Sequence, residues 1–102
     1  MRTEVIGRQI EITDAIREHA EGKVEKLLRH FDQVQQVTFT VTHQEHNAQA
    51  PFDVELLIVV EHHDDFVSTA KDADLYAAID QAVNKGSRQL TDHKEKLRDS
   101  HR

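Results

Sequence analysis

The sequence contains no cysteine and no tryptophan, and only three glycines and one proline occur among its 102 residues. Without cysteine, the chain has no disulfide framework, no thiol nucleophile and no thiolate metal site. It also lacks a glycine-rich phosphate loop and a serine at a nucleophile elbow, so we expect no enzymatic activity. Aromatic residues make up 5% and hydrophobic residues 37% of the chain. This composition predicts a small aliphatic core between two layers of secondary structure.

Long apolar runs are missing as well. The longest run, Leu56–Val60, is far too short to cross a bilayer. The beginning of the chain carries charged residues throughout and lacks the apolar run of a secretory signal. We therefore expect a cytoplasmic protein that folds as a single domain over residues 1–102, with its last few residues as a disordered tail.

The spacing of apolar residues predicts the element order β-α-β-β-β-α. The predicted strands cover residues 3–12, 35–44, 52–62 and 66–70, and the predicted helices cover residues 13–31 and a segment from 72 or 74 to about 97. We expect a bulge at Gly7 and Arg8 in the first strand. Gly22 lies within the first helical pattern and should weaken that helix by about 1 kcal/mol relative to alanine.

These elements predict an α+β fold with a four-stranded sheet and two helices packed on one face. The first strand–helix–strand unit should form a right-handed parallel crossover. The later strands are joined by short loops and should form an antiparallel meander. The opposite face of the sheet then carries threonines and carboxylates, with Leu57 and Val59 as an apolar exception.

Positive charge gathers in residues 85–98, although the chain has 13 Lys and Arg against 19 Asp and Glu and a net charge of −6. The five cations of this segment are Lys85, Arg88, Lys94, Lys96 and Arg98. Cations near a helix C-terminus suit the helix dipole, which explains the last turn. The dipole does not explain Lys85 and Arg88, which lie about three turns earlier.

The first helix is divided by sign. One flank of its apolar stripe carries His19, Lys23, Lys26 and His30, with Arg29 beyond them, and the other flank carries Glu18, Glu21 and Glu25. Ordinary pairs between neighbouring turns would explain this pattern for one helix alone. If two helices lie side by side, however, their basic flanks merge into one stripe that suits phosphate groups. No aromatic platform is evident, so binding of single strands by base stacking is disfavoured.

Three stretches of the sequence resemble the short ribosome hibernation-promoting factors. These stretches are IEITDAIREHAEGKVEKLLRHFD, DADLYAAIDQAVNK and RQLTDHKEKLR. The short factors belong with the ribosome-associated inhibitor A (Y protein) group, or sigma-54 modulation protein family, whose fold is β-α-β-β-β-α and is similar to double-stranded-RNA-binding domains. The resemblance covers nearly the whole chain and keeps the order and spacing of the motifs.

The resemblance implies a stationary-phase or stress factor without a cofactor. Such a factor binds the small (30S) ribosomal subunit and its 16S rRNA, blocks the mRNA and tRNA sites and promotes inactive ribosome dimers. It implies no membrane partner, a monomer when free, and a ribosome modulation factor as a candidate partner. Basic positions matching the family are Lys23, Lys26, Lys71, Lys85, Arg88, Lys94 and Lys96. Charge geometry adds Arg29 and Arg98 as rRNA-binding residues.

Two positions depart from the family pattern. Asp92 stands where relatives tend to carry lysine, and Gly86 stands where they carry a larger residue. Asp92 places a carboxylate in the sector that should face phosphates, and Gly86 should loosen the helix. We therefore expect a ribosome affinity that is lower or more salt-sensitive than is typical of the family.

Two other interpretations remain open. The outer face of the sheet, with Leu57 and Val59, would serve a non-catalytic protein-interaction module. Eight histidines suggest metal binding, but no metal-ligand motif is present, so we interpret them as surface residues. Protonation of His19, His30 and His93 at a pH of about 6 would add charge near the basic stripe. Tighter ribosome binding in mildly acid conditions is therefore a hypothesis.

Overall fold

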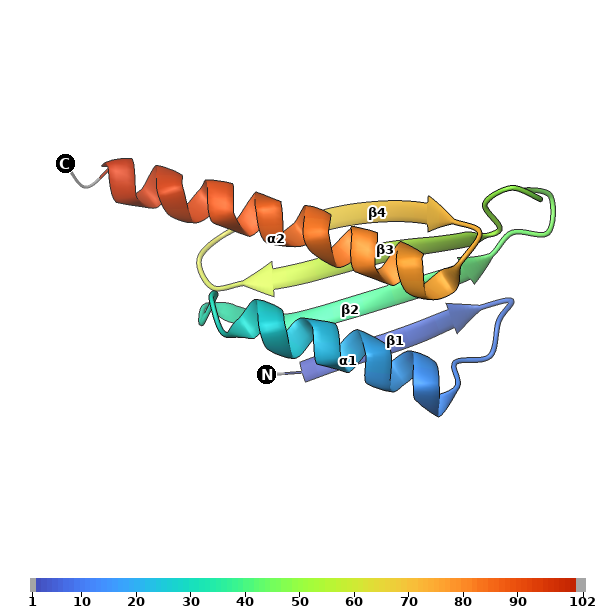
Figure 1. Ribbon diagram of the computed structural model, residues 1–102. Helices are drawn as coiled ribbons and strands as arrows, with labels where there is room; N and C mark the ends of the chain where they lie inside the picture. The colour runs from blue at the N-terminus through green and yellow to red at the C-terminus, as the bar shows by residue number, and fades with distance from the viewer. Residues whose placement is uncertain (1, 101–102) are drawn as a thin grey trace.

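The protein forms two layers, with a sheet on one side and two helices on the other (Figure 1). The computed structural model describes the backbone of residues 2–100 and the side chains of residues 2–96. The elements are β1 (Arg2–Arg8), α1 (Asp14–Leu28), β2 (Val34–His43), β3 (Phe52–Val60), β4 (Phe66–Asp72) and α2 (Leu75–Ser100). The predicted order of elements is confirmed.

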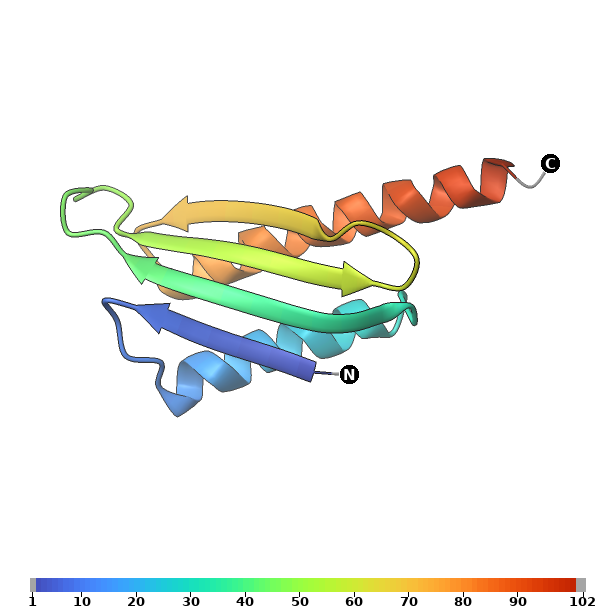
Figure 2. The same cartoon turned by 180° about the vertical axis from the view of Figure 1, so that it is seen from behind.

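The sheet has the strand order β1-β2-β3-β4. β1 is parallel to β2, while β2, β3 and β4 form the predicted antiparallel meander. Both helices cover the same face, so the other face is free of helices when the molecule is seen from behind (Figure 2). In the described part of the chain, neither helix is long and apolar enough to span a membrane.

The crossover from β1 through α1 to β2 is left-handed. In Figure 1, β1 and β2 both point to the right, β2 lies above β1, and α1 passes in front of them. The right-handed form expected from the sequence is far more common, and that prediction is wrong. Two constraints impose the rarer hand: β3 occupies the other edge of β2, and α1 shares a face of the sheet with α2.

Gly7 allows the chain to turn back tightly, and it does not form the predicted bulge. The register of β1 against β2 runs without a break, and the sheet's register shift falls instead in β2, between Val34 and Gln36. β1 ends at Arg8, and Gln9 follows with φ of 59°. A Cβ on Gly7 would collide with the carbonyl oxygen of Ile10. The close return of the chain therefore requires glycine at this position.

The core lies between the sheet and the helices. Its largest fully buried side chains are Phe39, Leu56, Ile58, Ile79, Val24, Val37, Val41 and Val54. Helical spacing predicts one apolar stripe on α2, made of Leu75, Ala78, Ile79, Ala82, Val83, Leu90 and Leu97. This stripe is buried from Leu75 to Leu90, and Leu97 lies outside the described side chains. α1 begins as predicted, because the Thr13 Oγ1 accepts a hydrogen bond from the Ile16 amide at 3.2 Å. It ends at Leu28, earlier than predicted, and Phe31 packs on the core from the following turn.

Gly86 brings α2 close to the sheet. A Cβ at this position would lie 2.9 Å from Ile58 Cδ1 and 3.2 Å from Leu56 Cδ2. Beside it, the buried Ser68 hydroxyl donates a 2.7 Å hydrogen bond to the carbonyl oxygen of Ala82 in α2. α2 continues through Gly86 without interruption. The glycine thus serves packing, which sequence spacing alone did not reveal.

Candidate nucleic-acid interface

Lys85 and Arg88 lie on the flank of α2 that faces β4, the edge strand of the sheet. The Lys85 ammonium donates a 2.7 Å hydrogen bond to the Thr69 carbonyl, and the Gln89 amide donates one of 3.0 Å to the Val67 carbonyl. Lys85, Arg88 and Asp92 line one shallow hollow over this strand. Lys96 is exposed, and eleven residues after Lys85 it falls on the same flank of the helix. We call Lys85, Arg88 and Lys96 the outer flank.

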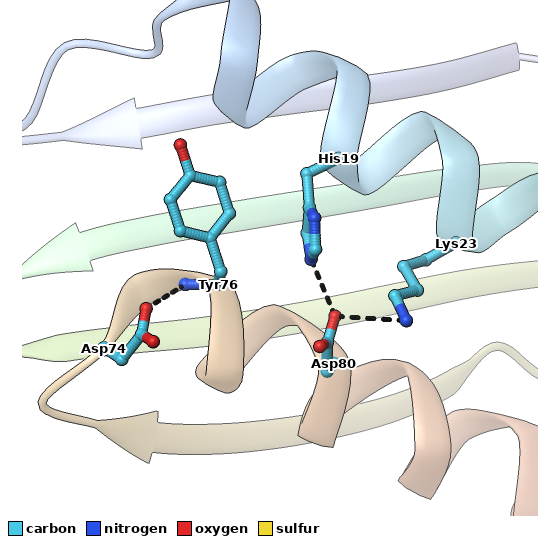
Figure 3. Close-up of polar contacts among 5 residues, drawn as sticks. All are labelled: His19, Lys23, Asp74, Tyr76 and Asp80. Atoms are coloured by element: carbon cyan, nitrogen blue, oxygen red, sulfur yellow. Dashed lines mark hydrogen bonds and ion pairs between the residues drawn. The ribbon is translucent and has the colours of Figure 1, made fainter.

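A second group of polar residues lies between the two helices (Figure 3). His19 Nε2 is 2.7 Å from Asp80 Oδ1, and Lys23 Nζ is 3.6 Å from the same oxygen. The His19 ring also meets the Tyr76 ring edge-on, with centroids 4.9 Å apart. The Asp80 carboxylate therefore contacts both His19 and Lys23 of α1, and it reduces the electrostatic field of the Lys23 ammonium.

Lys94 joins the later part of α2 to the end of α1. Its ammonium donates a 3.3 Å hydrogen bond to the His30 carbonyl and lies 5.8 Å from the centre of the Phe31 ring. Lys26 and Arg29 are exposed on α1 and at its C-cap. We call Lys23, Lys26 and Lys94 the groove cations. Lys23 contacts Asp80 of α2, Lys94 contacts the turn that follows α1, and Lys26 shares the flank of Lys23.

The basic flanks of the two helices do not merge into one stripe, contrary to the prediction. Lys85 points toward β4, at the far edge of the sheet from β1, whereas Lys23 points toward α2. The helical layer instead carries cations on both sides of α2. Asp92 lies among the outer-flank residues, as predicted. The side chain of Arg98 lies outside the described residues.

Lys71 lies on the other face of the sheet. Its neighbours Ser68 and Ala70 are buried against the helices, so the alternation of a strand directs Lys71 away from them. Its ammonium is 3.9 Å from Asp53 Oδ2, on the adjacent strand. Lys71 is thus separated from the other predicted RNA-binding residues.

The outer sheet face carries more apolar surface than the sequence analysis assigned. Val67 is 47% exposed and is the cross-strand partner of Leu57, and Ile6 is 42% exposed on β1. Alternation could have indicated Val67, but its strand is short. Asp80 and Tyr76 also escaped the sequence analysis, because only the packing of α1 beside α2 brings them against His19.

No group of three metal-ligating side chains occurs among the described residues. The histidines instead make other contacts: His19 pairs with Asp80, and His63 stacks on Phe66 with centroids 4.6 Å apart. His93 meets the His63 ring at 4.2 Å.

The fold and the charge distribution together define the class of this protein. It is a small α+β protein whose helical layer presents cations in fixed positions, which suits the binding of phosphate groups. Residues 3–98 match the family described as Sigma 54 modulation protein / S30EA ribosomal protein, and the chain belongs to that family. The ribosome hibernation promoting factor of Azotobacter vinelandii is 38% identical over 98 residues, which cover 94% of this chain and 85% of that protein. The factor of that name from Escherichia coli strain K12 is 35% identical over 100 residues, which cover 96% of this chain and 98% of that protein.

Two solved structures are similar to this fold. A ribosomal subunit interface protein from Coxiella burnetii superposes with a TM-score of 0.82 over 93% of this chain and 99% of that one, at 20% identity, which supports the fold alone. The N-terminal domain of Thermus thermophilus Protein Y superposes with a TM-score of 0.72 at 33% identity, over 85% of this chain and 91% of that one. The resemblance stated from the sequence motifs is thereby confirmed.

Proposed function

We propose that this protein is a ribosome hibernation factor that binds the small ribosomal subunit through its helical layer. The observation that carries the proposal is the pair of cation groups on the two sides of α2, in a family whose curated relatives are named ribosome hibernation promoting factors. Binding to 16S rRNA would occur in the cytoplasm, where it would occlude the mRNA and tRNA sites without any chemical step.

Several helical-layer cations are held in place before RNA arrives. The hydrogen bonds of Lys85 to Thr69 and of Lys94 to His30 restrict two long side chains that would otherwise lose conformational freedom on binding. Each ammonium keeps further protons to donate to phosphate oxygens. Contact with the phosphates would release counterions, which favours binding. Arg29 lies at the same end of the helical layer as Lys94 and would extend this contact.

Charge reversal tests the proposal most directly at Arg88 and Lys96. Both are exposed, and unlike Lys85 they have no hydrogen bond to β4 among the contacts described for residues 2–96. We expect Arg88→Glu with Lys96→Glu to weaken co-sedimentation with small subunits by about tenfold or more. The control is Lys71→Glu, which reverses an exposed cation on the opposite face of the sheet. It is matched in net charge to each of the single variants Arg88→Glu and Lys96→Glu, which are measured beside the double variant.

Unchanged binding by the double variant would contradict the proposal, and so would an equal loss with Lys71→Glu. Sucrose gradients of whole ribosomes, with and without the protein, would show in the same preparations whether dimers accumulate. Adding a ribosome modulation factor would show whether dimer formation requires that partner.

A second candidate function is a protein contact through the outer sheet face. Leu57 and Val67 are adjacent across β3 and β4, and Val67 is about half exposed. Exposed apolar residues that adjoin one another favour a protein partner. Val67→Glu would abolish such a contact and leave binding through the helical layer intact.

A further inference from the structure

We infer that the cavity beneath the later turns of α2 is a binding pocket for a nucleotide, a planar heteroaromatic ring that carries a phosphate. The cavity has a volume of about 110 Å³ and lies between α2, the turn after α1, and the facing ends of β2 and β3. It exists because α1 ends at Leu28 whereas α2 continues past the end of the sheet (Figure 1). A single water needs only about 10–15 Å³ by this measure, so there is room for a ring.

The floor of the cavity is apolar. Val34, Val60 and Leu90 line it, and they are 6%, 7% and 3% exposed. Phe31 forms a wall and is only partly buried. An apolar floor with an aromatic wall suits the faces and edges of a flat ring, and it offers nothing to a hydrated metal ion.

The rim carries the groups that would select an anion. Lys94 is exposed at the edge of the cavity, and two histidines, His30 and His93, also line it. The Lys94 ammonium is already positioned by its hydrogen bond to the His30 carbonyl and by the Phe31 ring, and it retains two further protons for a phosphate. A cation at the edge of an aromatic wall is the arrangement that a ring with an attached phosphate requires.

The remaining rim groups fit the edge of a nucleobase. The Asp32 carboxylate and the Gln33 side chain are exposed at the opening. A carboxylate accepts hydrogen bonds from the amino and ring N–H groups of a base, and an amide both donates and accepts. Asp32 would repel a second anion, so it also favours one orientation, with the base toward Asp32 and the phosphate toward Lys94.

One wall is stiffened from outside the cavity. The His93 ring lies 4.2 Å from the ring of His63 and 5.5 Å from that of Phe66, and these two rings are themselves stacked with an angle of 2° between their planes. This cluster joins the β3–β4 turn and β4 to α2. Because packing already holds this wall in place, little conformational entropy is lost when a ligand binds.

The ligand could be a free nucleotide or an unpaired nucleotide of an RNA strand, and both share the same chemistry. For a free nucleotide, the inference stands apart from ribosome binding. For an RNA nucleotide, it rests on the proposed function and adds a base contact to it.

The test is an NMR titration of the full chain, following the backbone amides. Adenosine monophosphate and uridine monophosphate should shift amides of the cavity, those of residues 30–34, 60 and 90–94, in a saturable way. Inorganic phosphate should leave the amides of the apolar floor in place, and adenosine without phosphate should bind about fivefold more weakly. Lys94→Gln should lower the affinity for both monophosphates by a similar factor, whereas the control Lys96→Gln should leave that affinity unchanged to within about twofold.

A second variant tests the ring contact. Phe31→Leu keeps an apolar side chain but removes the aromatic face, so it should lower the affinity for both monophosphates. If this variant loses its dispersed spectrum, the comparison of Lys94→Gln with Lys96→Gln still decides the question.

A single-stranded oligoribonucleotide forms the other arm. Shifts at the cavity with the oligonucleotide alone would assign the pocket to an RNA nucleotide, and shifts with the monophosphates alone would assign it to a free one. No saturable shift at the cavity with either ligand would overturn the inference. Equal effects of the Lys94 and Lys96 variants on the affinity for the monophosphates would overturn it as well. No ribosome enters this experiment, so its failure and a failure of small-subunit binding are separately visible.

Discussion

Asp80 is the residue whose replacement should most increase the positive potential of the helical layer. Its carboxylate faces His19 at 2.7 Å and Lys23 at 3.6 Å, with all three side chains partly exposed. A carboxylate here neutralises a cation that would otherwise be available to phosphate. At this exposure, the pairing itself contributes little to the stability of the fold.

Asp80→Asn should therefore strengthen binding to small ribosomal subunits by about two- to tenfold, because Lys23 loses its negative partner. Asp53→Asn is the matched control, since it makes the same change in net charge beside Lys71 on the opposite face. Affinity is measured by co-sedimentation over a range of protein concentrations. If both variants strengthen binding equally, net charge rather than the local carboxylate is responsible.

Two glycines in helices should respond to alanine in opposite ways. A Cβ at Gly22 meets no atom within 4 Å, so Gly22→Ala should raise the free energy of unfolding by about 0.5–1 kcal/mol. At Gly86 the same gain in helix stability is offset, because the added Cβ would lie only 2.9 Å from Ile58 Cδ1 in the core. Overpacking costs about 1–3 kcal/mol, so Gly86→Ala should be destabilising. Urea unfolding midpoints check both, and a Gly86→Ala variant as stable as Gly22→Ala would show that α2 shifts freely.

At the scale of the elements, α2 protects the free edge of β4. Lys85 and Gln89 donate to the carbonyl groups of Thr69 and Val67, which alternate along the strand and find no partner strand on that side. Unpaired edge strands invite association with other strands. Lys85 thus has a structural contact as well as a place in the proposed RNA-binding surface.

Replacing both donors, with Lys85→Leu and Gln89→Leu, should expose the edge of β4. We expect a loss of about 1 kcal/mol in the free energy of unfolding, because the donors are exposed and water partly replaces them. We also expect concentration-dependent self-association by analytical ultracentrifugation. Arg88→Leu is the control, because it adds similar apolar surface to α2. Equal association of the control would point to the apolar surface rather than the edge.

The start of α2 is tied to β4 through Asp72. Its carboxylate accepts hydrogen bonds from the Asp74 amide at 2.9 Å and from the Gln81 side chain at 2.8 Å. The Asp74 amide first, and then Gln81, hold the pKa of Asp72 below its ordinary value of 3.8. A depressed pKa in the folded state means that the stabilisation is complete above the unfolded pKa and is lost as the pH falls through the folded one.

Asp72→Asn should accordingly flatten the fall in stability on the acid side of about pH 4. The check is the urea midpoint as a function of pH for the wild type, Asp72→Asn and Gln81→Ala. Gln81→Ala removes one of the two hydrogen-bond donors to Asp72. Its plot of urea midpoint against pH should therefore lie between those of the wild type and Asp72→Asn. Superimposable pH curves for all three proteins would contradict the role given to Asp72.

For the whole molecule, the distribution of charge matters more than its sum. A net charge of −6 would repel RNA in general, yet the helical layer gathers cations on both sides of α2. Screening limits the reach of the remaining carboxylates to about 8 Å at physiological salt. The acidic remainder then disfavours binding of RNA in other orientations.

Salt dependence distinguishes the two surfaces of the molecule. If six cations of the helical layer meet phosphates, the logarithm of the affinity for small subunits should fall with the logarithm of salt concentration with a slope of about −4 to −5. Arg88→Gln should make this slope shallower by about one. A slope near zero would favour a contact through the apolar residues of the outer sheet face.

The amino-acid sequence alone determined the elements and their buried faces. Alternation in β2 and β3 and helical spacing in α1 and α2 separate the side chains that are buried from those that are exposed, because a residue's side of a strand or helix depends only on its local period. The motifs also sufficed to place the chain in its family. The predicted start of the first helix at residue 13 also agrees to within one residue with the structure, in which Thr13 caps α1.

Only the tertiary structure decided how these faces are combined. Whether Lys85 turns to β4 or toward α1, and which carboxylate meets Lys23, depends on how two helices lie over one sheet. The hand of the crossover followed from the shared helical face rather than from the usual preference. The close packing of Gly86 against the sheet and the cavity under α2 both arise where segments distant in the sequence meet. Such contacts produce no periodic pattern in the sequence from which they could be predicted.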